Sequence, residues 1–151
     1  MKNRDYLEIM ESAATYVAKE KPPMSSPAEV ANFLRPLMLN QPQEEFYVLF
    51  LNTRNKLIDF IKITTGLVDR TQIHAREVFR AAIINNTTRI VVSHNHPSSD
   101  PHPSPQDLES TRNLVAAGKI IGIEVIDHVI LGQKTETQPR DYLSFKEENL
   151  I

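Results

Sequence analysis

Two histidines and one aspartate lie at a spacing that strongly restricts what this chain can form. His94 and His96 follow the short apolar run 90–92, and Asp107 comes eleven residues after His96. Side chains alternate between the two faces of a strand, so the two histidines are expected to point to the same side. Two imidazoles and a carboxylate suit a divalent transition metal, most often zinc, and three protein ligands leave a position for water. The spacing therefore predicts a metal site of the open kind that catalysis needs.

Each part of this pattern also has a simpler explanation. The sequence Ser104-Pro105-Gln106-Asp107 is typical of a helix start, with serine at the N-cap, proline at the first helical position and an acid at the third. A single strand histidine is more often a hydrogen-bonded core residue than a ligand. Four of the ten prolines, at 97, 101, 103 and 105, stiffen the segment between the two parts. The combination favours a metal site, in which Asp107 can serve the helix as well as the metal.

The composition limits the alternatives. The 151 residues are enough for one ordinary domain, and the absence of cysteine excludes disulfides, thiolate ligands and a cysteine nucleophile. The net charge of −2 gives no overall basic field to hold nucleic acid. Acidic residues interrupt the first helical segment and no run approaches the roughly 20 apolar residues of a membrane span, so we expect a soluble cytoplasmic protein without a signal peptide.

The hydrophobic periodicity predicts a mixed α/β fold around a central sheet. Residues 1–40 are expected to form a helical extension and residues 41–151 the main domain. Pro36 is a candidate for ending the second helix early. The expected elements are helices at 4–19, 27–39, 74–86 (with Val78, Phe79, Ala82 and Ile83 as its inner face) and 105–117, a hairpin of strands 45–51 and 56–65, a loop at 66–73, a buried strand at 90–92, a strand at 120–131 interrupted by Gly122 and Asp127-His128, and a short strand at 142–145.

The metal-ligand spacing resembles a known family motif. His94-x-His96, seven residues, Ser104, two residues and Asp107 match the H-x-H-x7-S-x2-D motif of JAMM (MPN-plus, or JAB) metalloproteases. The longer string SHNHPSSDPHPSPQD is similar to the RadC-like branch of that superfamily, except that Ser99 stands where glycine is usual. Further similar segments are QEEFYVL at 43–49, Thr65-Gly66, HAREVF at 74–79 with alanine in place of proline, and Asp127-His128 to Gly132. The helix-hairpin-helix region of longer RadC proteins is not evident in residues 1–40.

The resemblance implies a fold, a metal and a reaction. It implies the cytidine-deaminase-like JAMM/MPN fold, with a central mixed β-sheet flanked by helices. It also implies zinc held by His94, His96 and Asp107, with water as the fourth ligand. The implied reaction is cleavage of a peptide or isopeptide bond in an unknown peptide or protein substrate, with Ser104 donating a hydrogen bond to the oxyanion.

The general base in such a family is a glutamate on the strand that follows the first helices. The E-x-F spacing of the RadC-like branch favours Glu44, whereas the shorter EF spacing of some other JAMM proteins selects Glu45. Without the family, both would be interpreted as a solvated pair at the entrance of a strand.

Two other functions compete with hydrolysis. The traditional "DNA repair" label of RadC-like proteins suggests DNA binding or processing. The slightly acidic composition of the chain and the lack of an evident helix-hairpin-helix region argue against this function. A metal-stabilised scaffold without activity is the other alternative, against which stands the complete motif. The sequence does not determine the substrate or the oligomeric state.

Ser99 is expected to affect the conformation of the loop before helix 105–117. Glycine often serves where φ is positive, and serine in its place raises the energy of such a conformation. We therefore expect a local change in the loop backbone and no change in the ligands.

Overall fold

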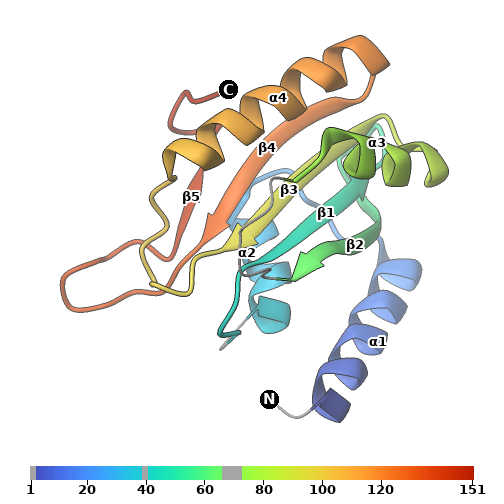
Figure 1. Ribbon diagram of the computed structural model, residues 1–151. Coiled ribbons are helices and arrows are strands. Elements are labelled where there is room, and N and C mark those ends of the chain that lie inside the picture. Colours follow the sequence, from blue (N-terminus) through green and yellow to red (C-terminus); the bar gives the residue numbers. More distant parts are fainter. Residues whose placement is uncertain (1–2, 39–40, 66–72) are drawn as a thin grey trace.

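A computed structural model describes residues 3–38, 41–65 and 73–151 of the chain (Figure 1). Its elements in chain order are α1 (Asn3–Glu20), α2 (Pro27–Met38), β1 (Glu45–Leu51), β2 (Leu57–Thr65), α3 (Ala75–Ile84), β3 (Arg89–Asn95), α4 (Pro105–Ile121), β4 (Glu124–Leu131) and β5 (Tyr142–Ser144). This confirms the predicted α/β class, with a central sheet flanked by helices.

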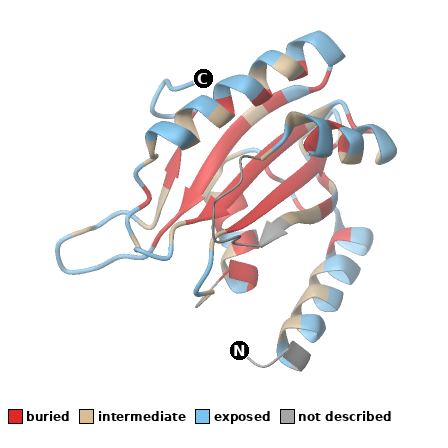
Figure 2. Ribbon diagram, viewed as in Figure 1, coloured by how far each residue is buried: buried red, intermediate tan, exposed pale blue. Residues whose placement is uncertain are grey.

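The five strands form one mixed sheet in the order β2-β1-β3-β4-β5. β1 pairs antiparallel with both β2 and β3, which confirms the predicted hairpin. β3 and β4 are parallel and are connected through α4, while β5 returns antiparallel beside β4. Every residue of β1 is buried, as expected for a central strand of aromatic and β-branched residues (Figure 2).

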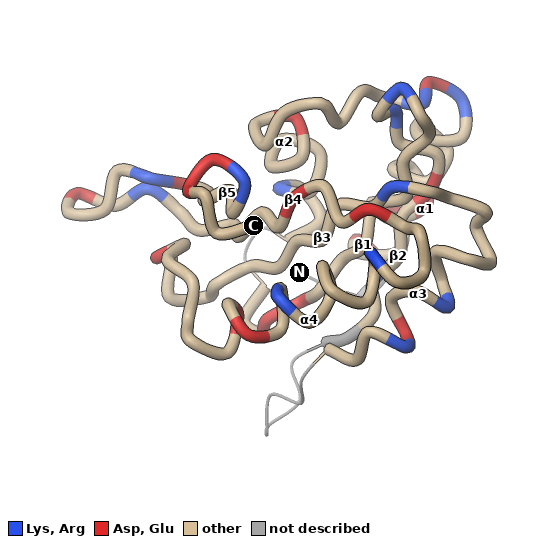
Figure 3. Tube along the Cα trace, turned by 90° about the horizontal axis from the view of Figure 1, so that it is seen from above, with Lys and Arg blue, Asp and Glu red and all other residues tan. Residues whose placement is uncertain are grey.

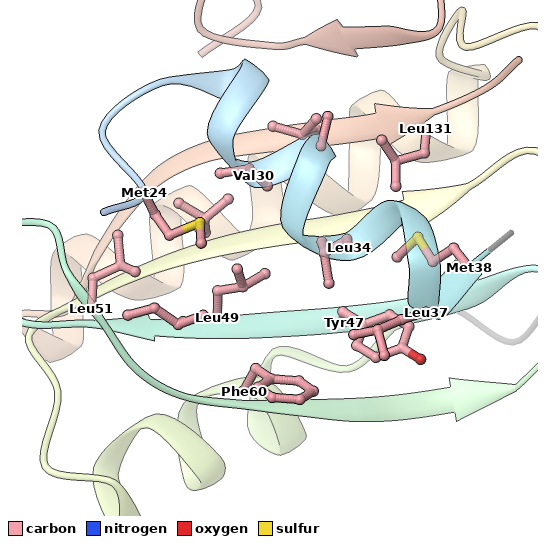
Figure 4. Packing of buried hydrophobic residues seen from close by; sticks show 14 of the residues in the cluster. Met24, Val30, Leu34, Leu37, Met38, Tyr47, Leu49, Leu51, Phe60 and Leu131 are labelled. Atoms are coloured by element: carbon pink, nitrogen blue, oxygen red, sulfur yellow. The ribbon is translucent and has the colours of Figure 1, made fainter. Parts of the chain in front are cut away.

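The helices cover both faces of the sheet. On one face, Leu34 and Leu37 of α2 pack with Tyr47 and Leu49 of β1 (Figure 4). On the other face, side chains of α3 and α4 pack against the alternate residues of β1 and β3, among them Phe50 and Val92. The strands therefore bury both faces, and the site described below can form only where the sheet ends.

The helical segments of residues 1–40 are part of this packing. α2 supplies five buried residues, and the hydroxyl of Tyr6 in α1 lies 3.2 Å from that of Tyr47. The division of the chain at residue 40 stays a prediction. In the part of the chain described, no helix is both long and apolar enough to cross a membrane.

Several predicted element boundaries were wrong. α4 continues to Ile121 and ends at Gly122, whose φ of +86° suits glycine, so β4 begins only at Glu124. Asp127 and His128 lie within β4 and do not interrupt it. Pro36 lies inside α2 and does not end it.

Two further expectations concern α3 and the segment before it. Ile83 was expected on the inner face of α3, but it is 60% exposed. The expected loop at 66–73 lies outside the described residues except for Ile73, and Gly66 lies outside them as well.

Candidate metal centre

The predicted ligands meet where β3 ends and α4 begins. His94 lies near the end of β3, where the strand is paired with β1 on one side and β4 on the other. His96 follows the strand, and its N–H donates a 2.8 Å hydrogen bond to the carbonyl oxygen of Leu131. Asp107 lies in the first turn of α4. Because β3 and β4 are parallel, α4 begins near the end of β3 and runs back toward the start of β4. The first turn of α4 therefore places the aspartate beside the histidines.

The distances between the three side chains fit a single metal ion. The Nε2 atoms of His94 and His96 are 2.9 Å apart, and the Asp107 oxygens Oδ1 and Oδ2 lie 3.4 Å and 3.1 Å from them, respectively. Ligands about 2.0–2.1 Å from a tetrahedral zinc ion are roughly 3.3 Å from one another. These three residues form a group that could bind a metal.

Asp107 serves its helix and the candidate metal centre together. Its Oδ2 accepts a 2.9 Å hydrogen bond from the Ser104 N–H, and its own N–H donates to Ser104 Oγ at 3.1 Å, which completes a capping box. Burial alone would raise the pKa of Asp107, but its interactions with His94 and His96 and the hydrogen bond from the Ser104 N–H hold it well below its ordinary value. Asp107 is thus a carboxylate, the form in which it can bind a metal.

His96 is oriented by the loop that follows it. Its Nδ1 lies 2.8 Å from the carbonyl oxygen of Asp100, which can only accept, so Nδ1 carries the hydrogen and Nε2 faces the other ligands. Burial alone would lower the pKa of His96, but hydrogen bonds with Asp107 and with the Asp100 backbone, together with the negative charges of Asp107 and Glu44, raise it above its ordinary value. The negative charges around His96 therefore stabilise positive charge on its ring.

His94 is held by residues from two other elements. Its Nδ1 lies 2.7 Å from Nε2 of His128 in β4, and Nδ1 of His128 lies 2.6 Å from Oγ1 of Thr111 in α4. Burial lowers the pKa of His128 well below its ordinary value, so the ring is neutral. Asp127 has separate partners, including the hydroxyl of Ser144 at 2.6 Å.

The two candidate bases lie in different surroundings. Glu45 is 5% exposed, and its carboxylate lies 3.2 Å from the hydroxyl of Tyr47 and 3.6 Å from Nζ of Lys62. Tyr47 belongs to the cluster beneath α2, whereas Phe46 stacks on the ring of His94. Glu44 precedes the strand and is partly exposed, and its charge acts on His96.

Asn95 connects Glu44 to the ligand strand. Its Oδ1 accepts a 2.6 Å hydrogen bond from the Glu45 N–H, and its Nδ2 donates a 3.1 Å bond to the Gln43 carbonyl oxygen. The amide of Asn95 thus binds the backbone on both sides of Glu44, and it is 6% exposed. This fixes the path of the chain at Glu44 relative to the neighbouring His94 and His96.

The sequence patterns did not identify three residues of the site: Asn95, Thr111 and His128. His128 does contact the neighbouring strand, but its partner there is a candidate ligand. One signal was present: a histidine inside the apolar run of β4 must find a hydrogen-bond partner, because buried polar groups are nearly always paired. His102, in contrast, has a 64% exposed side chain and bonds Asp100 away from the ligands.

The loop that orients His96 contains the expected positive φ. Ser99 has a φ of +76°, and its carbonyl oxygen accepts a 2.9 Å bond from the Gln133 N–H. A Cβ at Gly132 would collide with the same oxygen, so the loop lies directly on the end of β4. The unusual serine is therefore accommodated with the ligands in place.

Replacing Ser99 by glycine should stabilise the protein slightly. A non-glycine residue in the left-handed region costs roughly 1–2 kcal/mol, and the extra freedom of glycine in the unfolded chain offsets about 0.4–1 kcal/mol of the gain. We expect Ser99→Gly to raise the free energy of unfolding by about 0.5–1 kcal/mol in urea denaturation. Ser98, which has no positive φ, is the matched control, and Ser98→Gly should lower the same quantity. Equal effects of the two substitutions would contradict this account.

A cavity of about 440 Å³ opens beside the ligands. Its wall includes His96 and Pro97 from the loop, Arg35 and Met38 from α2, and Gln133 after β4. Nη1 and Nη2 of Arg35 donate to the carbonyl oxygens of Gly132 and Asp141, which joins α2 to the segment between β4 and β5. A larger groove lies between α1 and α2 and does not include the candidate ligands.

Comparison with known proteins gives matches over most of the chain. Residues 24–150 match a family described as the RadC-like JAB domain. A UPF0758 protein of Symbiobacterium thermophilum is 41% identical over 128 residues, which are 85% of this chain and 52% of that relative. A UPF0758 protein of Methanosarcina mazei is 34% identical over 144 residues, which are 95% of this chain and 60% of that relative. The chain thus spans between half and two-thirds of the length of these curated relatives.

Proposed function

Because the chain belongs to the RadC-like JAB domain family, we propose that it is a zinc-dependent hydrolase that cleaves an amide bond of a peptide or protein. The fold is consistent with a JAB/MPN-like domain. The proposal rests mainly on one observation: His94, His96 and Asp107 each offer a ligand atom, and these three atoms lie within 4.8 Å of one another. The charge of Glu44 acts on the same group through His96. The chemistry of this donor set suits zinc.

Zinc bound at this site would lower the pKa of a water molecule toward neutrality and polarise a substrate carbonyl group. Glu44 accepts the proton of the attacking water and delivers it to the leaving amine. The hydroxyl of Ser104, whose oxygen already accepts the Asp107 N–H, keeps its hydrogen for a bond to the oxyanion. The cavity beside His96 holds part of the substrate next to the reacting carbonyl.

A direct test uses a library of tryptic peptides from a bacterial lysate as the probe. Zinc-loaded protein should generate new peptide ends that mass spectrometry detects, and Asp107→Asn should not. Absence of cleavage with the zinc-loaded wild-type protein, on these peptides and on an isopeptide-linked peptide pair, would count against the proposed hydrolysis.

Glu44 and Glu45 are expected to differ sharply in this assay. Glu44→Gln should lower the cleavage rate by about 10²–10⁴-fold, the usual contribution of a general base, with the zinc content unchanged. Glu45→Gln should retain most of the rate, because its carboxylate bonds Tyr47 and pairs with Lys62. The opposite order of the two variants would assign the proton transfer to Glu45.

The distribution of basic residues does not support a role in nucleic-acid binding. In Figure 3 lysine and arginine are interspersed with aspartate and glutamate along the described chain. The candidate ligands have two acidic neighbours, Glu44 and Asp100, and such charges repel phosphates. An amide substrate without a dense negative charge suits this environment better.

A further inference from the structure

Thr111 and His128 form a hydrogen-bonded chain between two of the candidate ligands. The hydroxyl of Thr111 donates a 2.7 Å bond to the backbone carbonyl oxygen of Asp107, one turn earlier in α4. The same oxygen, Oγ1, lies 2.6 Å from Nδ1 of His128, and Nε2 of His128 lies 2.7 Å from Nδ1 of His94. Thr111, His128 and His94 are 0%, 2% and 4% exposed, so water does not complete their hydrogen bonds.

The positions of the hydrogens in this chain follow from its last acceptor. A carbonyl oxygen can only accept, and a threonine hydroxyl has one hydrogen to give. Since Thr111 gives its hydrogen to the Asp107 carbonyl, the contact with His128 requires Nδ1 of His128 to be the donor. The neutral ring then has a lone pair on Nε2, which accepts the hydrogen on Nδ1 of His94. The lone pair of His94 is therefore left on Nε2, the atom that faces His96 and Asp107.

The ring of His128 cannot avoid this arrangement by turning over. It stacks on Phe145 with ring centres 4.6 Å apart, and the edge-on ring of Phe46 lies 5.9 Å away. A flip of the ring would place carbon atoms against Thr111 and His94. Packing therefore fixes the plane of the ring, its two hydrogen bonds fix which edge faces Thr111, and Thr111 decides which of its nitrogens carries the hydrogen.

We propose that Thr111 and His128 are positioning residues that hold His94 in its metal-binding tautomer. The inference rests on the proposed metal site and extends it to residues outside the ligand motif. Outer hydrogen bonds of this kind typically change metal affinity by about 10–100-fold, since they orient the ligand and raise its basicity. Without the Thr111 hydroxyl, both rings can adopt the opposite tautomer. Nε2 of His94 then carries a hydrogen and has no lone pair for a metal.

The test compares Thr111→Val with Thr111→Ser and with Thr87→Val. Valine keeps the shape of threonine and removes its hydroxyl, while serine restores the hydroxyl. Thr87 is a matched control, because it is 6% exposed and its hydroxyl donates to the carbonyl oxygen of Leu51, away from the ligands. Zinc affinity is measured by competition with a chromophoric chelator, and histidine tautomers by nitrogen-15 correlation spectra of the metal-free protein.

We expect the wild-type protein to show the hydrogen on Nδ1 of both His94 and His128. Thr111→Val should bind zinc about 10–100-fold more weakly and show both tautomers inverted, while Thr111→Ser and Thr87→Val should match the wild type. A wild-type spectrum with the hydrogen on Nε2 of His94 would overturn the inference even if the valine variant does not fold. So would unchanged zinc affinity of folded Thr111→Val. A wild-type protein that binds no zinc would instead refute the proposed metal site.

Discussion

Replacement of His94 and His96 by alanine should abolish metal binding. The purified wild-type protein, offered zinc and then desalted, is expected to contain about one zinc ion per chain by elemental analysis, and the double variant none. The reason is that Asp107 alone remains to bind, so the loss exceeds the roughly 10–100-fold that an outer hydrogen bond contributes. Circular dichroism should show that the fold is retained, since neither histidine belongs to the two hydrophobic clusters that join the helices to the sheet.

His102→Ala is the matched control for this experiment. His102 lies in the same loop, but its side chain is 64% exposed and bonds Asp100, so its loss should leave the zinc content unchanged. A wild-type protein that holds no metal after zinc is offered would contradict the metal site. Ser104 and Asp107 would then act only as the cap of α4.

Replacement of Leu34 by alanine should lower the free energy of unfolding by about 3–4 kcal/mol. Leu34 is fully buried between α2 and the sheet, where it belongs to the same cluster as Tyr47 and Leu49 (Figure 4). The substitution removes the burial of its side chain and leaves a cavity that the sheet, held on both faces, cannot close. Urea denaturation followed by circular dichroism measures the change.

Leu7→Ala is the control for Leu34→Ala. Leu7 lies in α1 and is 60% exposed, so its substitution should change the free energy of unfolding by less than about 0.5 kcal/mol. A loss below about 1 kcal/mol for Leu34→Ala would mean that α2 can separate from the sheet without unfolding it. The expected large loss would instead make residues 27–38 part of the same cooperative unit as the strands.

The sequence predicted the elements whose patterns have one explanation. The run at 45–51 is rich in aromatic residues and the run at 90–92 is wholly β-branched, which favours strands, and the structure has β1 and β3 there. The end of α4 was missed because Ile120 and Ile121 favour a strand by type. They lie in the last turn of the helix, where Ile120 is 88% exposed, and Gly122 ends the helix by its positive φ.

The candidate site was predictable only where local spacing defines it. The ligand spacing brought His94, His96 and Asp107 together as expected. The partner of His94 is His128 in β4, which Thr111 in α4 contacts in turn, and no spacing along the chain reveals which strand lies beside β3. The alternation of side chains does separate the two glutamates, because Glu45 shares the face of Tyr47 while Phe46 faces His94.

Asn95 couples the backbone of Glu44 to the strand that carries the histidine ligands. Its own backbone lies between His94 and His96, and its side-chain amide forms hydrogen bonds with the backbone before and after Glu44. Any thermal displacement of the end of β3 therefore carries the backbone of Glu44 with it. Charged groups stabilise a transition state best when they do not have to reorganise during the reaction. The position of the Glu44 backbone relative to the ligands is thus set when the protein folds, before any substrate binds.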